Sequence, residues 1–315
     1  MHTPLHALRA ATPLTARVLA IALASSTPGL AVATSPVASP YGLQMPGDFH
    51  GDEPVARNGQ TWLAMRRAGH GQVELEAVRL RVSAIEDPLG DAPGEKTGRR
   101  VEAAGGGTAV DGTADDETVA FLRGPGLHAG PVVSARVETS GLSGLPDARI
   151  LLAGTEYRLQ TECTPFAQMG GDARTTSSPQ CSVLLRQGDT RTPLMTAPAT
   201  RMRQEDGTEV TSLGDDASPH LFFAGDLDRD GKLDLIFDTT DHYNVSQPTL
   251  FLSSAVASGS GLSDAALSEA GLLPTDPSGP DLPISDQTPP AHGAGNDSNN
   301  VQLLRAVAIY RAVGC

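Results

Sequence analysis

The hydrophobic pattern along the chain is that of many short β-strands. Apolar residues either alternate with polar ones or form short β-rich runs, and segments containing Gly and Pro separate these stretches. Turn signals at this density favour strands over helices. We therefore expect a mainly β fold of antiparallel sheets, sandwich-like or a meander, with irregular loops. The expected strands are Thr61–Met65, Val73–Ile85, Thr118–Leu122, Val132–Val137, Tyr157–Cys163, Cys181–Leu185, Leu221–Ala224, Leu233–Phe237 and Thr249–Leu252.

One of these strands changes phase. In Val73–Ile85 the apolar positions change from odd-numbered (Val73, Leu75, Ala77) to even-numbered (Val78, Leu80, Val82). Because a strand presents the same face at every second residue, this change would turn half of the strand away from its core. A bulge or tight bend between Ala77 and Val78 would restore a common apolar face.

The C-terminal segment, residues 301–315, fits two templates. Val301, Leu304 and Ala308 fall on one face of a helix. Read as a strand, the same segment puts Arg305 on its apolar face, which weakens the alternation. We therefore expect either a C-terminal strand or a short helix, packed on the β domain.

The rest of the chain divides into one β-rich domain, residues 47–256, and less regular segments. Residues 34–46 are small and include Pro, which is typical of a linker. Residues 257–300 hold few large apolar side chains, so ordering them would bury too little surface to offset the lost chain entropy. We expect a disordered insertion there, with at most a turn or two of helix over Asp264–Leu273, and a flexible loop over residues 104–117.

Residues 1–33 have the pattern of a secretory signal peptide. Arg9 and Arg17 make the start basic, Val18–Ala24 is a short apolar run, and Ala31–Ala33 supplies the small residues that a signal peptidase needs. The apolar run is far too short to cross about 30 Å of hydrocarbon. We therefore expect a secreted or periplasmic protein with no membrane span.

The charge balance bears on the partners. The 315 residues include 37 acidic and 23 basic side chains, which gives a formal net charge of −14. An acidic surface repels nucleic acid and anionic membranes, so we expect neither as a partner. The partner expected is an extracellular or periplasmic molecule whose identity the sequence does not give.

An oxidising compartment makes the cysteines candidates for pairing. Cys163 ends one expected strand and Cys181 begins another, and alternation puts both on the core face of their strands. If the two strands form a hairpin, a Cys163–Cys181 disulfide closes the polar loop 164–180; two buried free thiols are the alternative. Cys315 is left over, either as an idle thiol or as a link between chains.

The densest chemistry lies in residues 225–236, GDLDRDGKLDLI. Asp226, Asp228, Asp230 and Asp234 occupy positions 1, 3, 5 and 9 of a loop. Carboxylates this close repel one another strongly unless a cation neutralises them. A set of oxygen ligands at this density suits Ca²⁺, which accepts about six to eight of them in flexible geometry.

Other residues of the loop fit the same interpretation. Gly231 allows the sharp turn around an ion, and Lys232 at position 7 would offer its backbone carbonyl while its ammonium group points to water. Arg229 would face outwards and soften the local charge. A solvated acidic turn without metal is the alternative. The expected ligands of a structural Ca²⁺ are Asp226, Asp228, Asp230, Lys232 and Asp234.

The loop departs from an EF-hand in two ways. Position 12 is Phe237, where an EF-hand needs a bidentate Glu, and the segments on both sides look like strands. The loop instead resembles the calcium loops of FG-GAP and VCBS-type repeats, as in the integrin α-subunit propeller, over roughly residues 221–240. That resemblance implies side-chain ligation by the four aspartates and carbonyl ligation by Lys232.

The resemblance does not extend to the whole fold or to an activity. A propeller needs several similar blades, and the sequence holds a single such loop, so we do not expect a multi-blade propeller. The wider segment, through the TLFLSS stretch at 249–254, is also similar to secreted bacterial proteins that bring no activity to carry over.

Catalytic signatures are missing from the sequence. It has no G-x-S-x-G elbow, no H-E-x-x-H and no phosphate-cradling Gly loop. Asp241 and His242 follow shortly after the acidic loop and either belong to a turn or act as acid–base groups. We expect a calcium-binding β protein that serves as a binding or structural module rather than as an enzyme. A secreted hydrolase that uses Asp241 and His242 is the alternative.

Overall fold

The structure is a computed structural model of the chain. The predicted signal peptide, most of the loop 104–117 and Cys315 lie outside the residues that it describes. The described residues belong to the unit Ala38–Cys315. They are residues 39–68, 72–105, 117–139, 145–164, 179–203, 207, 209–270, 272 and 302–313.

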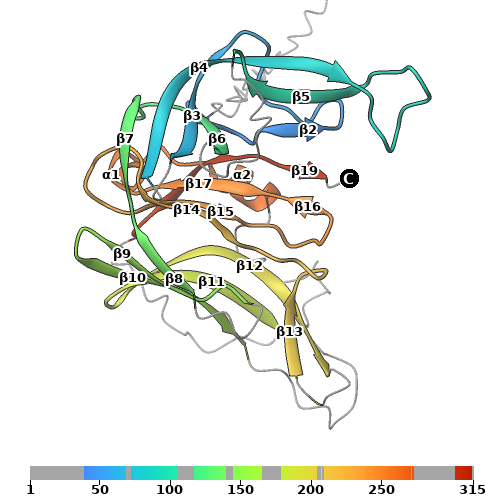
Figure 1. Ribbon diagram of the computed structural model, residues 1–315. Coiled ribbons are helices and arrows are strands. Elements are labelled where there is room, and N and C mark those ends of the chain that lie inside the picture. The colour runs from blue at the N-terminus through green and yellow to red at the C-terminus, as the bar shows by residue number, and fades with distance from the viewer. Residues whose placement is uncertain are drawn as a thin grey trace, which may run out of the picture. The chain divides into compact units, whose positions relative to one another are not determined.

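The larger of the two main sheets curls into a nearly closed, barrel-like structure (Figure 1). Its strands pair antiparallel, and the hydroxyl of Ser39, just before β1, donates to the carbonyl of Val307 in β18, so the two ends of the path come together. In sheet order the path is β1 (Gly42–Gln44), β6 (Glu117–Arg123), β3 (Thr61–Ala68), β4 (Gln72–Ile85), β7 (Gly130–Ser134), β14 (Leu221–Asp226), β15 (Asp234–Asp238), β17 (Pro248–Leu252) and β18 (Arg305–Ile309), with β5 (Gly98–Ala103) beside β4 and β2 (Gly47–Phe49) beside β5.

One face of most strands on this path fills the inside of the sheet. Leu43, Met65, Leu122, Ile236 and Leu250 come from five different strands, are at most 1% exposed, and belong to one apolar cluster. Because side chains alternate along a strand, every second residue reaches this interior. The cluster joins the N-terminal strands to strands from the last third of the chain.

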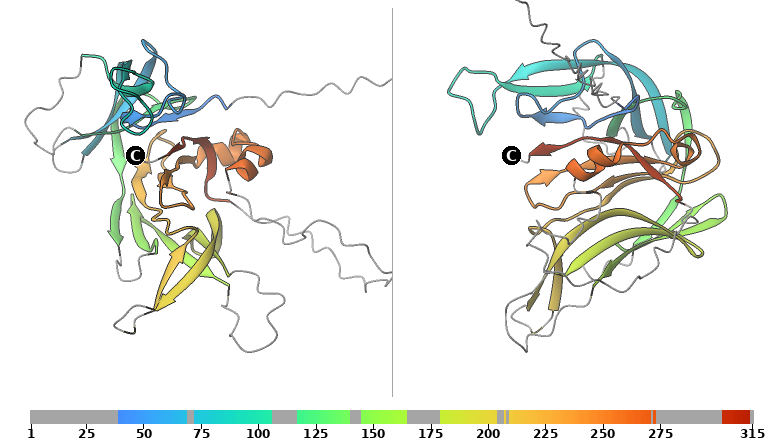
Figure 2. Two further views of the ribbon diagram at one scale, coloured as in Figure 1. Left: turned by 90° about the vertical axis from the view of Figure 1, so that its right-hand side faces the viewer. Right: turned by 180° about the vertical axis from the view of Figure 1, so that it is seen from behind.

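A second sheet packs against the outer face of β14, β15 and β17 (Figures 1 and 2). Leu159 and Leu185 of this sheet share a buried cluster with Leu235 of β15 and Phe251 of β17. β15 and β17 are therefore buried on both faces, which explains why their sequences run as continuous apolar stretches. The strand order is β13 (Glu209–Leu213), β12 (Thr190–Arg203), β11 (Gln180–Gln187), β10 (Thr155–Cys163), β9 (Ala148–Leu152) and β8 (Arg136–Thr139).

The phase change in β4 marks a passage between two cores. β4 pairs with β3 through this point in unbroken register, and its second part pairs with β5. Leu75 lies in the inner cluster, whereas Leu80 packs with Trp62 in a separate cluster on the other side of the sheet. The predicted bulge between Ala77 and Val78 is therefore wrong, because each half of the strand serves its own core.

A strand occupies part of the expected linker. β1 lies within residues 34–46, where Tyr41 and Leu43 are 8% and 1% exposed and pack in the inner cluster. The linker prediction is wrong for this part. Two large apolar side chains are enough to anchor a short strand when a partner, here β6, is available for pairing.

The expected disordered insertion also begins with ordered structure. α1 (Ser254–Ser258) follows β17, and α2 (Asp264–Glu269) lies within residues 257–300. Leu267 packs against the cluster between the sheets, and Leu272 is a buried member of it. The prediction of disorder is wrong for residues 257–270 and Leu272, because these leucines bury apolar surface, whereas α2 is the turn or two of helix expected over Asp264–Leu273; residues 271 and 273–300 lie outside the described residues.

The C-terminal segment adopts the strand alternative. β18 pairs with β17, and β19 (Ala312–Val313) pairs with β16 (Val245–Ser246). The segment therefore packs on the β domain as predicted. The fold is mainly β and antiparallel, which confirms the predicted class.

The predicted disulfide is present. Cys163 and Cys181 are bonded and stand opposite each other in the register of β10 and β11. Cys181 is buried, but Cys163, at the end of β10, is exposed, so only one of the two faces the core as expected. Among the described residues, no helix combines the length and the apolar character needed to span a membrane.

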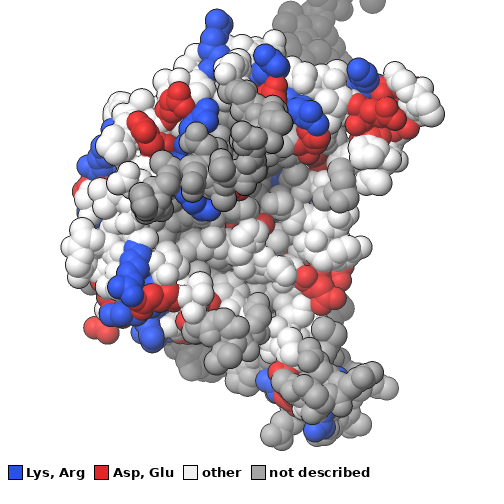
Figure 3. Space-filling model, viewed as in Figure 1, with Lys and Arg blue, Asp and Glu red and all other residues white. Residues whose placement is uncertain are grey.

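Charged side chains of both signs are interspersed on the face shown in Figure 3. Arg149 lies 2.8 Å from Glu156, and Arg100 lies 2.6 Å from Asp48. Exposed pairs of this kind add little to stability. In these pairs each acidic group lies beside a basic one. The loop between β14 and β15 differs, because three of its aspartates lie together.

Candidate metal site

The acidic loop connects β14 to β15 as a hairpin. Gly225 pairs with Asp234, so Asp226 is the last residue of β14 and Asp234 the first of β15. Because both strands are buried, they carry these two side chains into the interior, where Asp226 is 7% exposed and Asp234 is 0% exposed. The hairpin thus places two acidic groups where an uncompensated charge is costly.

Three of the four aspartates converge on one point. Asp226, Asp228 and Asp234 each offer a carboxylate oxygen, and these oxygens all lie within 4.8 Å of one another. Oxygens bound at about 2.4 Å from one Ca²⁺ are at most about 4.8 Å apart, so the spacing fits ligands around a single ion. This buried group could hold a metal ion.

One carboxylate oxygen of Asp226 lacks a hydrogen-bond partner among the described residues. Its Oδ2 accepts a hydrogen bond from the backbone N–H of Gly231 at 3.0 Å, whereas its buried Oδ1 has no hydrogen-bond partner among the described residues. Asp238, another buried aspartate of the same hairpin, has both oxygens occupied, by backbone N–H groups at Oδ1 and by the hydroxyl of Ser246 at Oδ2. Buried carboxylate oxygens are normally satisfied in this way, so the Asp226 oxygen indicates a missing partner.

The pKa values of the buried aspartates indicate what kind of partner is missing. Burial, helped by the nearby charge of Asp228, raises the pKa of Asp234 to about 8, even though backbone N–H groups of Ser253 and Leu227 donate to it at 2.9 and 2.8 Å. Burial also raises the pKa of Asp226. Two interior carboxyls whose charged form is disfavoured by burial are suited to a cation, whose charge reverses the effect.

Asp230 and Lys232 lie at the exposed side of the loop. Asp230 is outside the convergent group: its Oδ1 accepts the backbone N–H of Lys232 at 2.8 Å, and its Oδ2 lies 3.8 Å from the Lys232 Nζ. The lysine ammonium therefore softens the charge of Asp230. Ligation by Asp230 and by the Lys232 carbonyl stays a prediction.

The backbone of the loop is held in an uncommon conformation. Gly231 has a φ of 82°, as the tight turn requires, and Arg229 has a φ of 62°, which is unusual for a residue with a side chain. Arg229 donates to the carbonyls of His128 and Ala129, each at 3.1 Å. The arginine was expected to face outwards and soften the local charge; it also ties the loop to the segment between β6 and β7.

Two serines that the sequence did not single out as site residues complete the surroundings. Ser253 donates from its hydroxyl to Asp230 Oδ2 at 2.9 Å and to Asp234 Oδ1 at 3.2 Å, and the hydroxyl of Ser254 donates to Asp228 Oδ2. Both follow β17, which pairs with β15. The sequence signal that could have found them is their position directly after the expected strand Thr249–Leu252, because an antiparallel neighbour of β15 ends beside the start of β15.

Among the described residues, the side chain of His242 contacts Asp215 and the backbone of Asn244 rather than the side chain of Asp241. His242 accepts the backbone N–H of Asn244 at Nδ1, 3.0 Å away, and its Nε2 lies 3.3 Å from Oδ2 of Asp215. Both ring nitrogens are therefore occupied. The hydroxyl of Thr240 donates to the His242 carbonyl and so also serves the turn. This arrangement supports the interpretation of the segment as a turn.

Comparison with known proteins adds nothing to this geometry: no family model matches the chain, and no curated protein or solved structure shows significant similarity to it.

Proposed function

We propose that the protein binds one Ca²⁺ between Asp226, Asp228 and Asp234 and is an exported binding or structural module stabilised by that ion. The buried Oδ1 of Asp226, which has no hydrogen-bond partner among the described residues, carries the proposal, because an oxygen of the same carboxylate lies within 4.8 Å of oxygens of Asp228 and Asp234. A cation satisfies all three at once.

The choice of Ca²⁺ follows from the donor chemistry. The convergent groups are carboxylates only, with no imidazole or thiolate among them, which favours a hard cation over zinc or copper. The loop is short and irregular, and Ca²⁺ accepts such geometry more readily than Mg²⁺, which demands a near-ideal octahedron. Export is supported by the N-terminal sequence pattern and by the Cys163–Cys181 disulfide, since disulfides persist in oxidising compartments.

Isothermal titration calorimetry of chelator-treated protein tests the proposal directly. We expect one calcium per chain with a dissociation constant on the order of 10⁻⁴–10⁻³ M, as in other extracellular modules, and much weaker binding of magnesium. The Asp226→Asn variant should lose the binding. Asp241→Asn, which changes an exposed aspartate outside the loop, is the matched control and should bind as the unaltered protein does. Failure of the unaltered protein to bind calcium at millimolar concentration would refute the site.

A further inference from the structure

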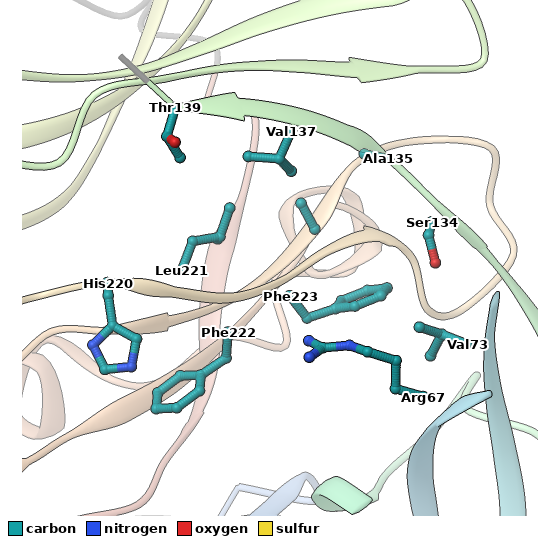
Figure 4. Close-up of a pocket in the computed structure, with 11 residues that line it drawn as sticks. Arg67, Val73, Ser134, Ala135, Val137, Thr139, His220, Leu221, Phe222 and Phe223 are labelled. Carbon is teal, nitrogen blue, oxygen red and sulfur yellow. The ribbon is translucent and has the colours of Figure 1, made fainter. Parts of the chain in front are cut away.

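A groove of about 410 Å³ lies beside the first half of β14 (Figure 4). Its walls are the end of β3, the start of β4, the segment from β7 to β8, and β14 itself. A second hollow, also of about 410 Å³, shares Arg67, Leu221 and Phe222 with the first and continues toward β6 and the loop after β1. The two hollows together form an elongated groove at one end of the barrel-like sheet, away from the acidic loop.

The groove exists because one segment serves both sheets. β7 pairs with β14 only at Gly225 and Asp226, and the last backbone bond between the two runs from the N–H of Ala135 to the carbonyl of Ala224, at 2.9 Å. The chain then continues as β8, which pairs with β9 in the second sheet. As a result, Leu221–Phe223 pairs with β15 on one side, and no strand of the described chain pairs with its other edge.

Side chains at this edge combine apolar surface with one cation. The register of β14 against β15 shifts between Leu221 and Phe223, which marks a bulge at Phe222. Bulges redirect side chains, and here Leu221 and Phe222 are half-buried along the groove. Figure 4 shows Arg67 reaching from β3 into the groove toward Phe222 and Phe223.

Arg67 is available for another acidic partner. Its ion pair with Glu117 spans 3.6 Å between side chains that are 46% and 67% exposed, so it is weak. Among the described residues, the other titratable group in the first hollow is His220, so no described carboxylate lines that hollow, whereas Glu117 lines the second. In a chain with a net charge of −14, this is a local site for negative charge.

We infer that this groove binds an extended peptide segment of another protein, which pairs with the free edge of β14 and places an acidic side chain on Arg67. A row of unpaired backbone groups is a template for a further strand, and a strand bound in this way gains main-chain hydrogen bonds along its length. At about 3.3 Å per residue, the stretch from His220 to Phe223 accommodates about four residues of such a strand. The adjoining apolar side chains would receive alternate residues of the peptide.

A peptide of alternating sequence, acetyl-Val-Glu-Val-Glu-Val-Glu-Val-amide, is the probe. Titrated into the isotope-labelled protein in calcium-containing buffer, it should shift the backbone NMR signals of residues 220–224 and of the end of β3. Its counterpart with Lys in place of Glu should bind at least about tenfold more weakly, because it meets Arg67 with like charge. Equal binding of the two peptides, shifts confined to other parts of the protein, or no binding at millimolar concentration would overturn the inference.

Variants of Arg67 test whether this residue recognises the acidic side chain of the peptide. Arg67→Glu should weaken binding of the acidic peptide at least about tenfold. The matched control is Arg81→Glu, which alters an arginine of similar exposure, paired with Glu102 at 3.2 Å, and should stay within about twofold of the unaltered protein. If the two variants bind equally well, Arg67 does not recognise the peptide and the inference fails.

The same peptide tests strand pairing when alternate backbone nitrogens are methylated. Methylation removes donors from one edge and leaves every side chain in place, so binding should be lost if the peptide adds to β14. Unchanged binding would contradict strand addition. Decanoate provides the last comparison: if it binds at Arg67 and the peptides do not, the groove is a site for small apolar anions and the peptide inference is wrong.

Discussion

Replacing Asp234 by Asn should stabilise the metal-free protein. The carboxyl is 0% exposed and its pKa is raised from 3.8 to about 8, so at pH 7 the folded protein must protonate it, while the unfolded chain leaves it ionised. Over about three pH units at about 1.4 kcal/mol each, that difference costs about 4 kcal/mol. Asn is close in shape and carries no charge, so Asp234→Asn avoids this cost.

The gain is reduced by a lost hydrogen bond. The two oxygens of Asp234 accept hydrogen bonds from the backbone N–H groups of Leu227 and Ser253. In Asn one of these oxygens is replaced by an amide nitrogen, which cannot accept a hydrogen bond, so one of the two donors loses its partner. An unsatisfied buried donor costs about 1–3 kcal/mol. We therefore expect Asp234→Asn to be more stable than the unaltered protein in EDTA by about 1–3 kcal/mol, a rise in Tm of a few degrees for a chain of this size.

Calcium should stabilise the unaltered protein more than Asp234→Asn and so offset the stability advantage that the variant has in EDTA. At a concentration about one hundred times the dissociation constant, an ion that binds only the folded state adds about 2.7 kcal/mol to the unaltered protein. Asp234→Asn lacks one of the negative charges that attract the ion, so it should bind calcium more weakly and gain less stability from it. Calorimetric scans in EDTA and in about 10 mM calcium, a hundredfold excess at the tighter end of the expected range, give all four values.

The pH dependence in EDTA provides an internal check. Because the folded pKa of Asp234 lies above its unfolded value of 3.8, the folded state holds the proton more tightly, and stability should fall as pH rises from 3.8 toward about 8. The Asn variant should lack this part of the decline. A variant that is less stable than the unaltered protein in EDTA, or that gains as much from calcium, would refute the reasoning.

Two further predictions concern features away from the loop. The contact between His50 Nδ1 and Asp87 Oδ2, at 2.6 Å, raises the pKa of His50, so the stability that it adds is complete below the unfolded value of 6.5 and is lost as pH rises through the raised value. In saturating calcium, urea unfolding between pH 6 and pH 8 should show this loss in the unaltered protein and not in His50→Gln; equal slopes would contradict it. Replacing both Cys163 and Cys181 by Ala should lower the free energy of unfolding by about 3 kcal/mol, because the 18-residue separation that the disulfide spans regains its freedom in the unfolded chain. A calorimetric loss below about 1 kcal/mol would show that the unfolded loop is already restrained.

Strands were predictable where the local pattern alone determines them. The predicted strands around Leu63, Leu122 and Leu159 lie where expected because alternation, or a β-rich run between turn signals, is visible within a few residues. β12 was missed because Pro193 and Pro198 argue against a strand. The structure accommodates Pro193 beside a shift of register opposite Val183 and Leu184, and such an irregularity cannot be read from one strand alone.

The candidate site was predictable in its ligands and not in its surroundings. The regular spacing of the aspartates pointed to the loop, and the hairpin brings Asp226, Asp228 and Asp234 together. Ser253 lies 19 residues after Asp234, and its contact depends on the pairing of β15 with β17. The burial of Asp234 likewise depends on cores on both sides of β15, which no local pattern reports.

The proposed ion would act at the weakest junction of the larger sheet. β7 and β14 pair over Gly225 and Asp226 alone, so the connection between the N-terminal strands and the rest of the barrel-like sheet rests on few backbone bonds at this point. Asp226 is also one of the convergent carboxylates, and Arg229, from the same loop, donates to carbonyls just before β7. An ion that orders the loop would therefore hold β14 against β7. It would do so at the end of β14 opposite the groove, away from the edge at Leu221–Phe223 where the partner is proposed to bind.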